Sequence, residues 1–236
     1  MHKLRPVTVQ RHFTNKSAGS VLYRCGDTVL LCTASLENKV PDWMVGMGKG
    51  WITAEYNMLP GSTSPRKARE RAGKIDGRTT EIQRLIGRSF RAVADLQKLG
   101  ERSLTIDCEV LQADGGTRTA AITGGFIALV DAVNSAFRGV PINEYPLRSS
   151  VAAISVGIVD EEPSLDLDYA RDVRADVDMN VVMTGAGRFI EIQGTGEEAT
   201  FDDEQLASLL KLAKQGISEL TETQRQSLGN DWPWSA

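Results

Sequence analysis

The chain has 236 residues and a mass of 25.7 kDa, with 41% hydrophobic residues, 25% charged residues and a net charge of -4. This length can bury a core without disulfides or structural metals, and the composition excludes a disordered chain, a collagen-like fibre and a coiled coil. No apolar run approaches the length of a membrane span, and the three cysteines lie in apolar stretches that favour buried, reduced thiols. We therefore expect a soluble, cytoplasmic protein.

The first half of the chain begins with strands and ends in a long helix. Apolar runs predict a buried strand over residues 28–36 and a shorter one over 51–56. A Gly-, Pro-, Ser- and Arg-rich loop follows over residues 57–76. A helix is predicted over 81–99, with Arg84, Arg88 and Arg91 on the face opposite its apolar stripe.

The second half mixes strands and helices. LTIDCEV, residues 104–110, alternates as a half-buried strand does, and residues 117–137 predict a helix that is apolar nearly all round and therefore buried. Further strands are predicted at 151–159, 165–170, 178–183 and 189–193. The last helix starts at Asp202, with Gln205 completing a capping box, and the tail is expected to fray. Without a regular βαβ rhythm, the predicted class is α+β.

The charges are segregated along the chain. Residues 61–92 carry nine basic and three acidic residues, whereas residues 160–178 carry eight acidic and two basic ones. A basic segment attracts polyanions whatever the total charge is, and an acidic segment can hold a divalent cation. Together they indicate phosphate chemistry, and two solvated surfaces of opposite sign are the alternative interpretation.

The segment QADGGTRT, residues 112–119, has the features of an anion site. Gly115 and Gly116 allow a tight turn that exposes consecutive N–H groups at a helix N-terminus, where an anion is favoured. Thr117 adds a hydroxyl and Arg118 a guanidinium fork that suits phosphate. A plain strand-to-helix turn with Thr117 as N-cap is the alternative. The segment is neither a P-loop nor a dinucleotide fingerprint.

Arg78, Asp172 and Asp178 are the other candidates. Arg78 precedes the arginine-striped helix, where a cation is electrostatically misplaced, and this favours an anion clamp. Asp172 and Asp178 would lie about 20 Å apart on one extended strand and on different faces of a helix. They converge only if the chain reverses between them, as in a hairpin turning around residues 173–176. Such a pair would hold Mg²⁺, and an exposed acidic turn is the alternative.

Seven segments in order resemble the bacterial ribonuclease PH family: RPVTVQRHFT, GDTVLLCTAS, GWITAEYNMLP, GRTTEIQRLIGRSFRA, LTIDCEVLQADGGTRTAAITG, VAAISVGIV and DMNVVMTGAGRFIEIQGT. The resemblance implies a fold like domain 2 of ribosomal protein S5. It also implies a single domain over residues 1–236, with a core at 5–228 and a tail at 229–236. The implied activity is a phosphate-dependent 3′-to-5′ exoribonuclease that trims tRNA precursors. The implied assembly is a homohexameric ring, a trimer of dimers, with no membrane or DNA partner.

The resemblance also assigns roles to residues by matching motif. The phosphate site matches four positions: Arg78, Gly116, Thr117 and Arg118. The essential aspartates, implicated in Mg²⁺ binding and catalysis, match Asp172 and Asp178, and the tRNA-binding arginines match Arg66 and Arg69.

The resulting hypothesis is reversible phosphorolysis, in which inorganic phosphate attacks the last phosphodiester of an RNA 3′ end and releases a nucleoside diphosphate. One alternative is a hydrolytic, metal-dependent nuclease, which has no need of the paired arginines. The other is a non-catalytic RNA-binding ring subunit, against which the presence of both arginines and both aspartates counts. The face of Arg84, Arg88 and Arg91 helps to hold the RNA backbone, and a ring contact is the alternative role for Arg88.

Overall fold

The computed structural model describes residues 3–69, 76–197 and 199–234. The strands are β1 (Val7–Arg11), β2 (Gly19–Cys25), β3 (Thr28–Glu37), β4 (Trp51–Met58), β5 (Ser103–Gln112), β6 (Val151–Val159), β7 (Glu162–Leu165), β8 (Ala175–Thr184) and β9 (Phe189–Gly196). The helices are α1 (Gly77–Val93), α2 (Leu96–Leu99), α3 (Thr117–Phe137), α4 (Tyr169–Asp172) and α5 (Asp203–Leu228), with 3₁₀ turns at Asp42–Met44, Pro60–Ser62 and Gly229–Asp231.

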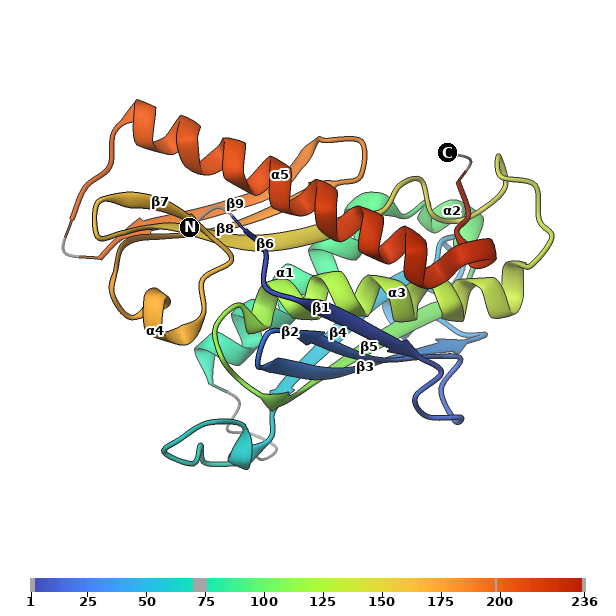
Figure 1. Cartoon of the computed structure of the whole chain (residues 1–236). Coiled ribbons are helices and arrows are strands. Elements are labelled where there is room, and N and C mark those ends of the chain that lie inside the picture. The colour runs from blue at the N-terminus through green and yellow to red at the C-terminus, as the bar shows by residue number, and fades with distance from the viewer. Residues whose placement is uncertain (1–2, 70–75, 198, 235–236) are drawn as a thin grey trace.

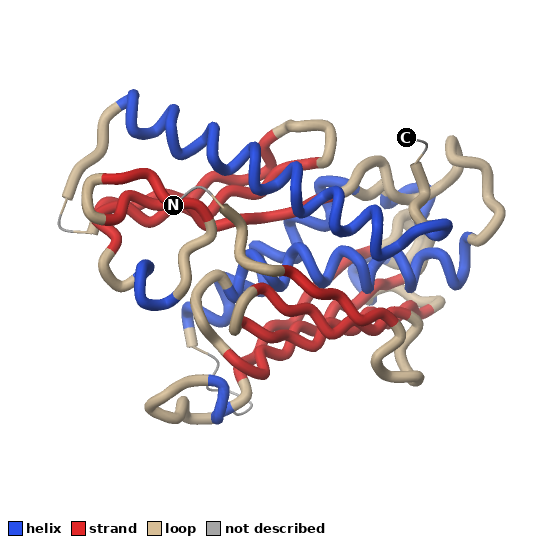
Figure 2. Tube along the Cα trace, viewed as in Figure 1, coloured by secondary structure: helices blue, strands red, loops and turns tan. Residues whose placement is uncertain are grey.

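Two sheets and the helices between and beside them form the architecture (Figure 1). The first sheet has the order β1-β2-β3-β5-β4, antiparallel except for the parallel pair β4–β5. The second has the order β7-β6-β8-β9 and is antiparallel throughout. Helix α3 lies between the sheets and contacts both, whereas α5 packs on the second sheet against β6 and β7 (Figure 2). The predicted α+β class is confirmed.

Helix α3 is the centre of the fold. It has the bounds that its pattern predicts and is buried from Thr119 to Val133. By length and composition it could span a membrane, but 78% of its apolar stretch is buried inside the fold. Its apolarity therefore has a structural cause, because a helix between two sheets must bury every face. The three cysteines are free and buried, as expected.

The helix predicted over 81–99 is in fact two helices. Asp76 caps α1 by accepting a hydrogen bond from the N–H of Thr79 at 2.6 Å. After Val93 the chain leaves the helix because Ala94 forms a β-bridge with Leu147. The helix therefore begins four residues earlier than predicted and ends six residues earlier.

Two other local predictions are wrong. Residues 165–170 do not form a strand, since β7 ends at Leu165, Asp166 has a left-handed φ of 54° and α4 follows. The tail does not fray over the residues that are described. Trp234 stacks on Phe126 with ring centroids 6.2 Å apart, and Arg11 donates to the Asp231 carboxylate at 2.7 Å. The sequence patterns also miss β1 and β2, short strands that pair with each other.

Candidate active site

The residues singled out in the sequence gather at one cavity of about 630 Å³. The turn between β5 and α3, the start of α1, the loop after β4 and the α4–β8 connection all contribute to its wall. Seven of the eight predicted site residues line it: Arg66, Arg78, Gly116, Thr117, Arg118, Asp172 and Asp178. The structure thus brings the basic and the acidic segments of the chain together.

The turn Asp114–Thr117 connects β5 to α3, and we call it the phosphate turn after the role that the sequence resemblance implies for it. Gly115 and Gly116 have φ values of 71° and 64°, a left-handed conformation that favours glycine. A β-carbon on Gly115 would also collide with the carbonyl oxygen of Leu167. The N-cap of α3 is Gly116, which has no capping side chain, rather than Thr117. The first N–H groups of α3 therefore have no side-chain cap and are directed to the cavity end of the helix.

Thr117 is held by a buried tyrosine that sequence reasoning missed. The hydroxyls of Tyr56, on β4, and Thr117 are 2.8 Å apart and share a hydrogen bond. Burial raises the pKa of Tyr56, which keeps this phenol neutral at physiological pH. Its inward position on β4 follows from strand alternation, but its partner does not.

Arg78 and Arg118 each occupy the second position of a helix, α1 and α3 respectively. Both helices direct their positive dipole ends at the cavity, which adds to the charge of the two guanidinium groups. One edge of Arg118 is occupied, because Nη1 donates to Glu81 Oε2 at 3.2 Å and to Gln193 Oε1 at 3.1 Å. These contacts hold the guanidinium in place while it lines the cavity.

Asp172 and Asp178 converge, but not as a hairpin of two strands. Asp172 is the last residue of α4, the chain reverses after it, and Asp178 lies within β8. In the sheet, Asp178 pairs with Gly157 and Thr195. The reversal that the spacing required is therefore present, in the form of a helix followed by a strand.

Both carboxylates have raised pKa values. Desolvation and the nearby charge of Asp172 raise the pKa of Asp178 to about 6. Desolvation likewise raises the pKa of Asp172, while Arg78 and Arg118 oppose the shift. Asp178 is partly buried and Asp172 is exposed. A cation bound beside them would stabilise the charged form of both carboxylates.

The oxygen donors fit Mg²⁺. Asn180 lies two residues after Asp178 on the same face of β8 and also lines the cavity. Within the described ranges, no cluster of three or more His, Cys, Asp or Glu residues could hold a metal. A site with two carboxylates is what Mg²⁺ uses when waters and substrate phosphates complete its octahedron. The carboxylates of Asp172 on α4 and Asp178 on β8 therefore suit a metal ion that also binds the phosphates of the substrate.

The remaining basic residues are divided. Arg66 lines the cavity, whereas Arg69 does not. Arg69 lies near Glu109 on β5. Burial raises the pKa of Glu109, and the positive charge of Arg69 partly offsets that rise. Arg71 and Lys74 lie outside the described residues.

The predicted three-arginine face is only partly available. Arg88 pairs with Glu191 at 2.8 Å. Arg91 donates to the carbonyl of Ile52 at 2.7 Å and lies over the ring of Trp51. Arg84 remains exposed on this face of α1.

Comparison with known proteins decides the family. The sequence profile described as "3′ exoribonuclease family, domain 1" matches residues 3–134, and that of domain 2 matches residues 149–216. The chain belongs to the 3′ exoribonuclease family.

Within this family, the chain is 64% identical over 232 residues to Ribonuclease PH of Rhodopirellula baltica, covering 96% of this chain and 94% of that protein. It is 56% identical over 229 residues to Ribonuclease PH of a Geobacillus species, covering 96% and 90%. The predicted resemblance to ribonuclease PH is confirmed.

Two solved structures share the fold of this chain. Rice Rrp46 superimposes with a TM-score of 0.77 at 19% identity, with 96% of each chain covered. An Archaeoglobus fulgidus exosome with RNA bound to the active site gives a TM-score of 0.78 at 18% identity, covering 94% of this chain and 89% of that one. The arrangement of sheets and helices is thus the family's fold.

Proposed function

We propose that this protein is a phosphorolytic 3′-to-5′ exoribonuclease that trims the 3′ ends of tRNA precursors, a phosphate-dependent nucleotidyltransferase. The observation that carries the proposal is the meeting of an anion site and a pair of carboxylates in one cavity. A phosphate nucleophile needs the first, and a transferring phosphoryl group benefits from the charge that the second can hold.

The phosphate turn and the two arginines bind inorganic phosphate. Arg78 and Arg118 neutralise its charge, and the Gly116 and Thr117 N–H groups fix its orientation at the start of α3. Holding the nucleophile in line with the scissile bond supplies much of the rate enhancement in phosphoryl transfer.

The reaction then exchanges one phosphoester-type bond for another. A phosphate oxygen forms a bond to the phosphorus of the last phosphodiester, and the bond from that phosphorus to the 3′-oxygen of the preceding nucleotide breaks. The attacking phosphate gives up a proton as its new bond forms, and the departing 3′-oxygen takes up a proton, so that the proton balance is kept. The products are a nucleoside 5′-diphosphate and an RNA one residue shorter, and the reaction reverses when diphosphates are abundant.

Asp172 and Asp178 would hold Mg²⁺. When bound there, the ion supplies positive charge for the transferring phosphoryl group and the leaving oxygen. The charged carboxylates have the same sign as the RNA phosphates, and a cation that they hold would offset the repulsion. Asn180 offers an additional oxygen on the same face of β8.

Arg66 and Arg69 hold the RNA backbone leading into the cavity, and their positive charge makes binding salt-dependent.

We further propose a homohexameric ring, a trimer of dimers, in the cytoplasm. Three exposed apolar side chains after β3, Trp43, Val45 and Met47, support an assembly, because apolar groups clustered on a surface are typical of interfaces.

The test incubates the purified protein and Mg²⁺ with a 3′-labelled tRNA precursor, with and without inorganic phosphate. We expect labelled nucleoside diphosphate only with phosphate, and its loss in Arg118→Ala and Asp178→Ala. Arg225→Ala, which removes an exposed arginine of α5, is the matched control and should retain activity. Monophosphate released without phosphate would instead identify a hydrolase. RNA binding without any release would identify a non-catalytic ring subunit.

A further inference from the structure

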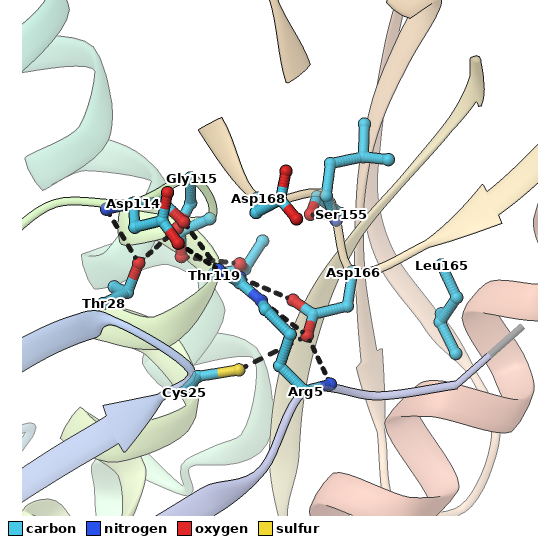
Figure 3. Close-up of polar contacts among 12 residues, drawn as sticks. Arg5, Cys25, Thr28, Asp114, Gly115, Thr119, Ser155, Leu165, Asp166 and Asp168 are labelled. Atoms are coloured by element: carbon cyan, nitrogen blue, oxygen red, sulfur yellow. Dashed lines mark hydrogen bonds and ion pairs between the residues drawn. The ribbon is translucent and has the colours of Figure 1, made fainter. Parts of the chain in front are cut away.

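The phosphate turn is held from behind by side chains that do not line the active-site cavity (Figure 3). Arg5 Nη1 donates to the carbonyl of Asp114 at 2.6 Å. The hydroxyl of Thr28 donates to the carbonyl of Gly115 at 2.7 Å. The hydroxyl of Thr119 donates to the carbonyl of Gly116 at 2.9 Å. Three consecutive carbonyls of the turn thus accept hydrogen bonds from side chains outside the lining of the cavity.

Occupying these carbonyls orients the N–H groups of the turn. In a trans peptide the N–H points opposite to the C=O of the same unit. The carbonyls of Asp114, Gly115 and Gly116 share their peptide units with the N–H groups of Gly115, Gly116 and Thr117. In the part of the chain that the structure describes, no acceptor binds these three N–H groups. All three residues line the cavity, so the donors behind the turn aim a row of N–H groups at the anion site.

Thr28 makes the most specific of these contacts. It is the first residue of β3 and is fully buried. Its hydroxyl donates to the Gly115 carbonyl and also accepts the N–H of Asp114 at 3.0 Å. The ladder between β3 and β5 ends one residue away, at Val29 and Gln112. The side chain of Thr28 therefore continues the exchange of hydrogen bonds into a turn where the backbones no longer pair.

Arg5 connects the same turn to the acidic half of the site. Its backbone N and its Nε each donate to Asp166 Oδ2 at 2.9 Å, and its Nη2 donates to Oδ1 at 2.8 Å. Asp166 is buried and lies between β7 and α4, the helix that ends with Asp172. The guanidinium thus joins the phosphate turn, through Asp114, to the segment that carries the first aspartate of the cation pair.

We propose that Thr28 is a positioning residue for inorganic phosphate, which it serves by holding the phosphate turn in its anion-binding conformation, with Arg5 as its auxiliary. The inference rests on the proposed function, because it assigns the N–H groups of Gly115–Thr117 to the phosphate co-substrate. Thr28 does not line the cavity, so it acts only through the turn.

The decisive variant is Thr28→Val, which keeps the shape of the side chain and removes its hydroxyl. We expect the KM for phosphate to rise about tenfold, as when a hydrogen bond to a charged group is weakened, while the KM for RNA changes less than twofold. Thr28→Ser keeps the hydroxyl and should restore the phosphate KM to within about twofold of the wild type. A normal phosphate KM in folded Thr28→Val overturns the inference.

Thr123→Val is the matched control. Thr123 is equally buried, donates to the carbonyl of Ala153 at 3.2 Å and accepts the N–H of Ala153 at 3.1 Å, but it joins α3 to β6 away from the turn. It should lose as much thermal stability as Thr28→Val and keep the wild-type phosphate KM. An equal rise of the phosphate KM in this control would also overturn the inference, because general loosening would then explain both.

A second variant covers the case in which Thr28→Val does not fold. Arg5→Lys keeps a positive charge beside Asp166 but cannot reach Asp166 and the Asp114 carbonyl together, so the phosphate KM should again rise with the RNA KM unchanged. An unchanged phosphate KM in Arg5→Lys would refute the inference that the hydrogen bonds behind the turn position the phosphate. If the wild type itself releases diphosphate without any dependence on phosphate, the proposed function fails. If the wild type depends on phosphate and the variants resemble it, only this inference fails.

Discussion

Asp178→Asn should make the metal-free protein more stable at neutral pH, although it removes a residue of the active site. The pKa of Asp178 is raised to about 6, from an ordinary value of 3.8, by desolvation and by the charge of Asp172. A charged carboxylate in this position costs folding energy that a neutral amide of the same shape does not.

The sign and size of the effect follow from linkage. Between pH 3.8 and about 6, the folded chain holds the Asp178 proton more often than the unfolded chain does. Wild-type stability therefore falls as the pH rises through this window, and the full penalty is present above it. A shift of about two pKa units corresponds to about 3 kcal/mol. Because the side chain is only partly buried, solvent screening reduces this to about 1 to 2 kcal/mol.

The assay is thermal denaturation in EDTA at a series of pH values. The Tm of Asp178→Asn relative to the wild type should increase by about 3 to 6 °C between pH 4 and pH 7.5. Since Asp172 is the neighbouring like charge, the difference reports on the pair and not on one residue. Asp176→Asn removes an exposed carboxylate from the same strand and is the matched control for the loss of one negative charge.

A difference between Asp178→Asn and the wild type that stays constant with pH would refute the electrostatic argument. Mg²⁺ supplies a further check at pH 7.5, since it should raise the Tm of the wild type and leave that of Asp178→Asn nearly unchanged. An equal rise in both would mean that the cation binds elsewhere.

Arg11→Met should lower stability by about 3 to 5 kcal/mol in denaturant unfolding, because it leaves the buried carboxylate of Asp131 without its partner, and a loss under 1 kcal/mol would contradict this. Gly115→Ala should lower both Tm and phosphate affinity, because Gly115 has a φ of 71° and a β-carbon there would collide with the carbonyl oxygen of Leu167. An unaltered phosphate KM in this variant would contradict the assignment of phosphate binding to the turn. Arg66→Ala and Arg69→Ala should each reduce the slope of log K for RNA against log salt by about 0.7, as measured by filter binding, and unchanged slopes would remove them from the RNA path.

Local patterns were sufficient for elements whose faces are defined by periodicity. The bounds of α3 and the alternation of β5 follow from residue spacing, since a helix or strand buries the same face wherever it packs. The capping box of Asp202 and Gln205 is likewise as predicted, because its partners are three residues apart. The tight turn expected at Gly115 and Gly116 is also present, and the left-handed φ values of these two glycines depend on local residue type.

Contacts between distant segments were beyond those patterns. The helix over 81–99 breaks because Ala94 finds a β-bridge partner at Leu147. The tail up to residue 234 is ordered because Trp234 reaches Phe126 on α3. In both cases the local sequence favours another state, a continuous helix or a frayed tail. The contact with a distant residue makes the observed state lower in free energy.

The candidate site divides in the same way. Residue types and their spacing identify the groups with the required chemistry: a two-glycine turn before a helix, arginines at helix starts, and aspartates that need a chain reversal to meet. The packing of the elements brings Asp172 and Asp178, on α4 and β8, to the cavity of Arg78 and Arg118. It also places Thr28 behind the phosphate turn. The reason is physical: spacing along the chain sets the direction of a side chain on its own element, whereas the packing of two sheets around α3 sets which side chains meet.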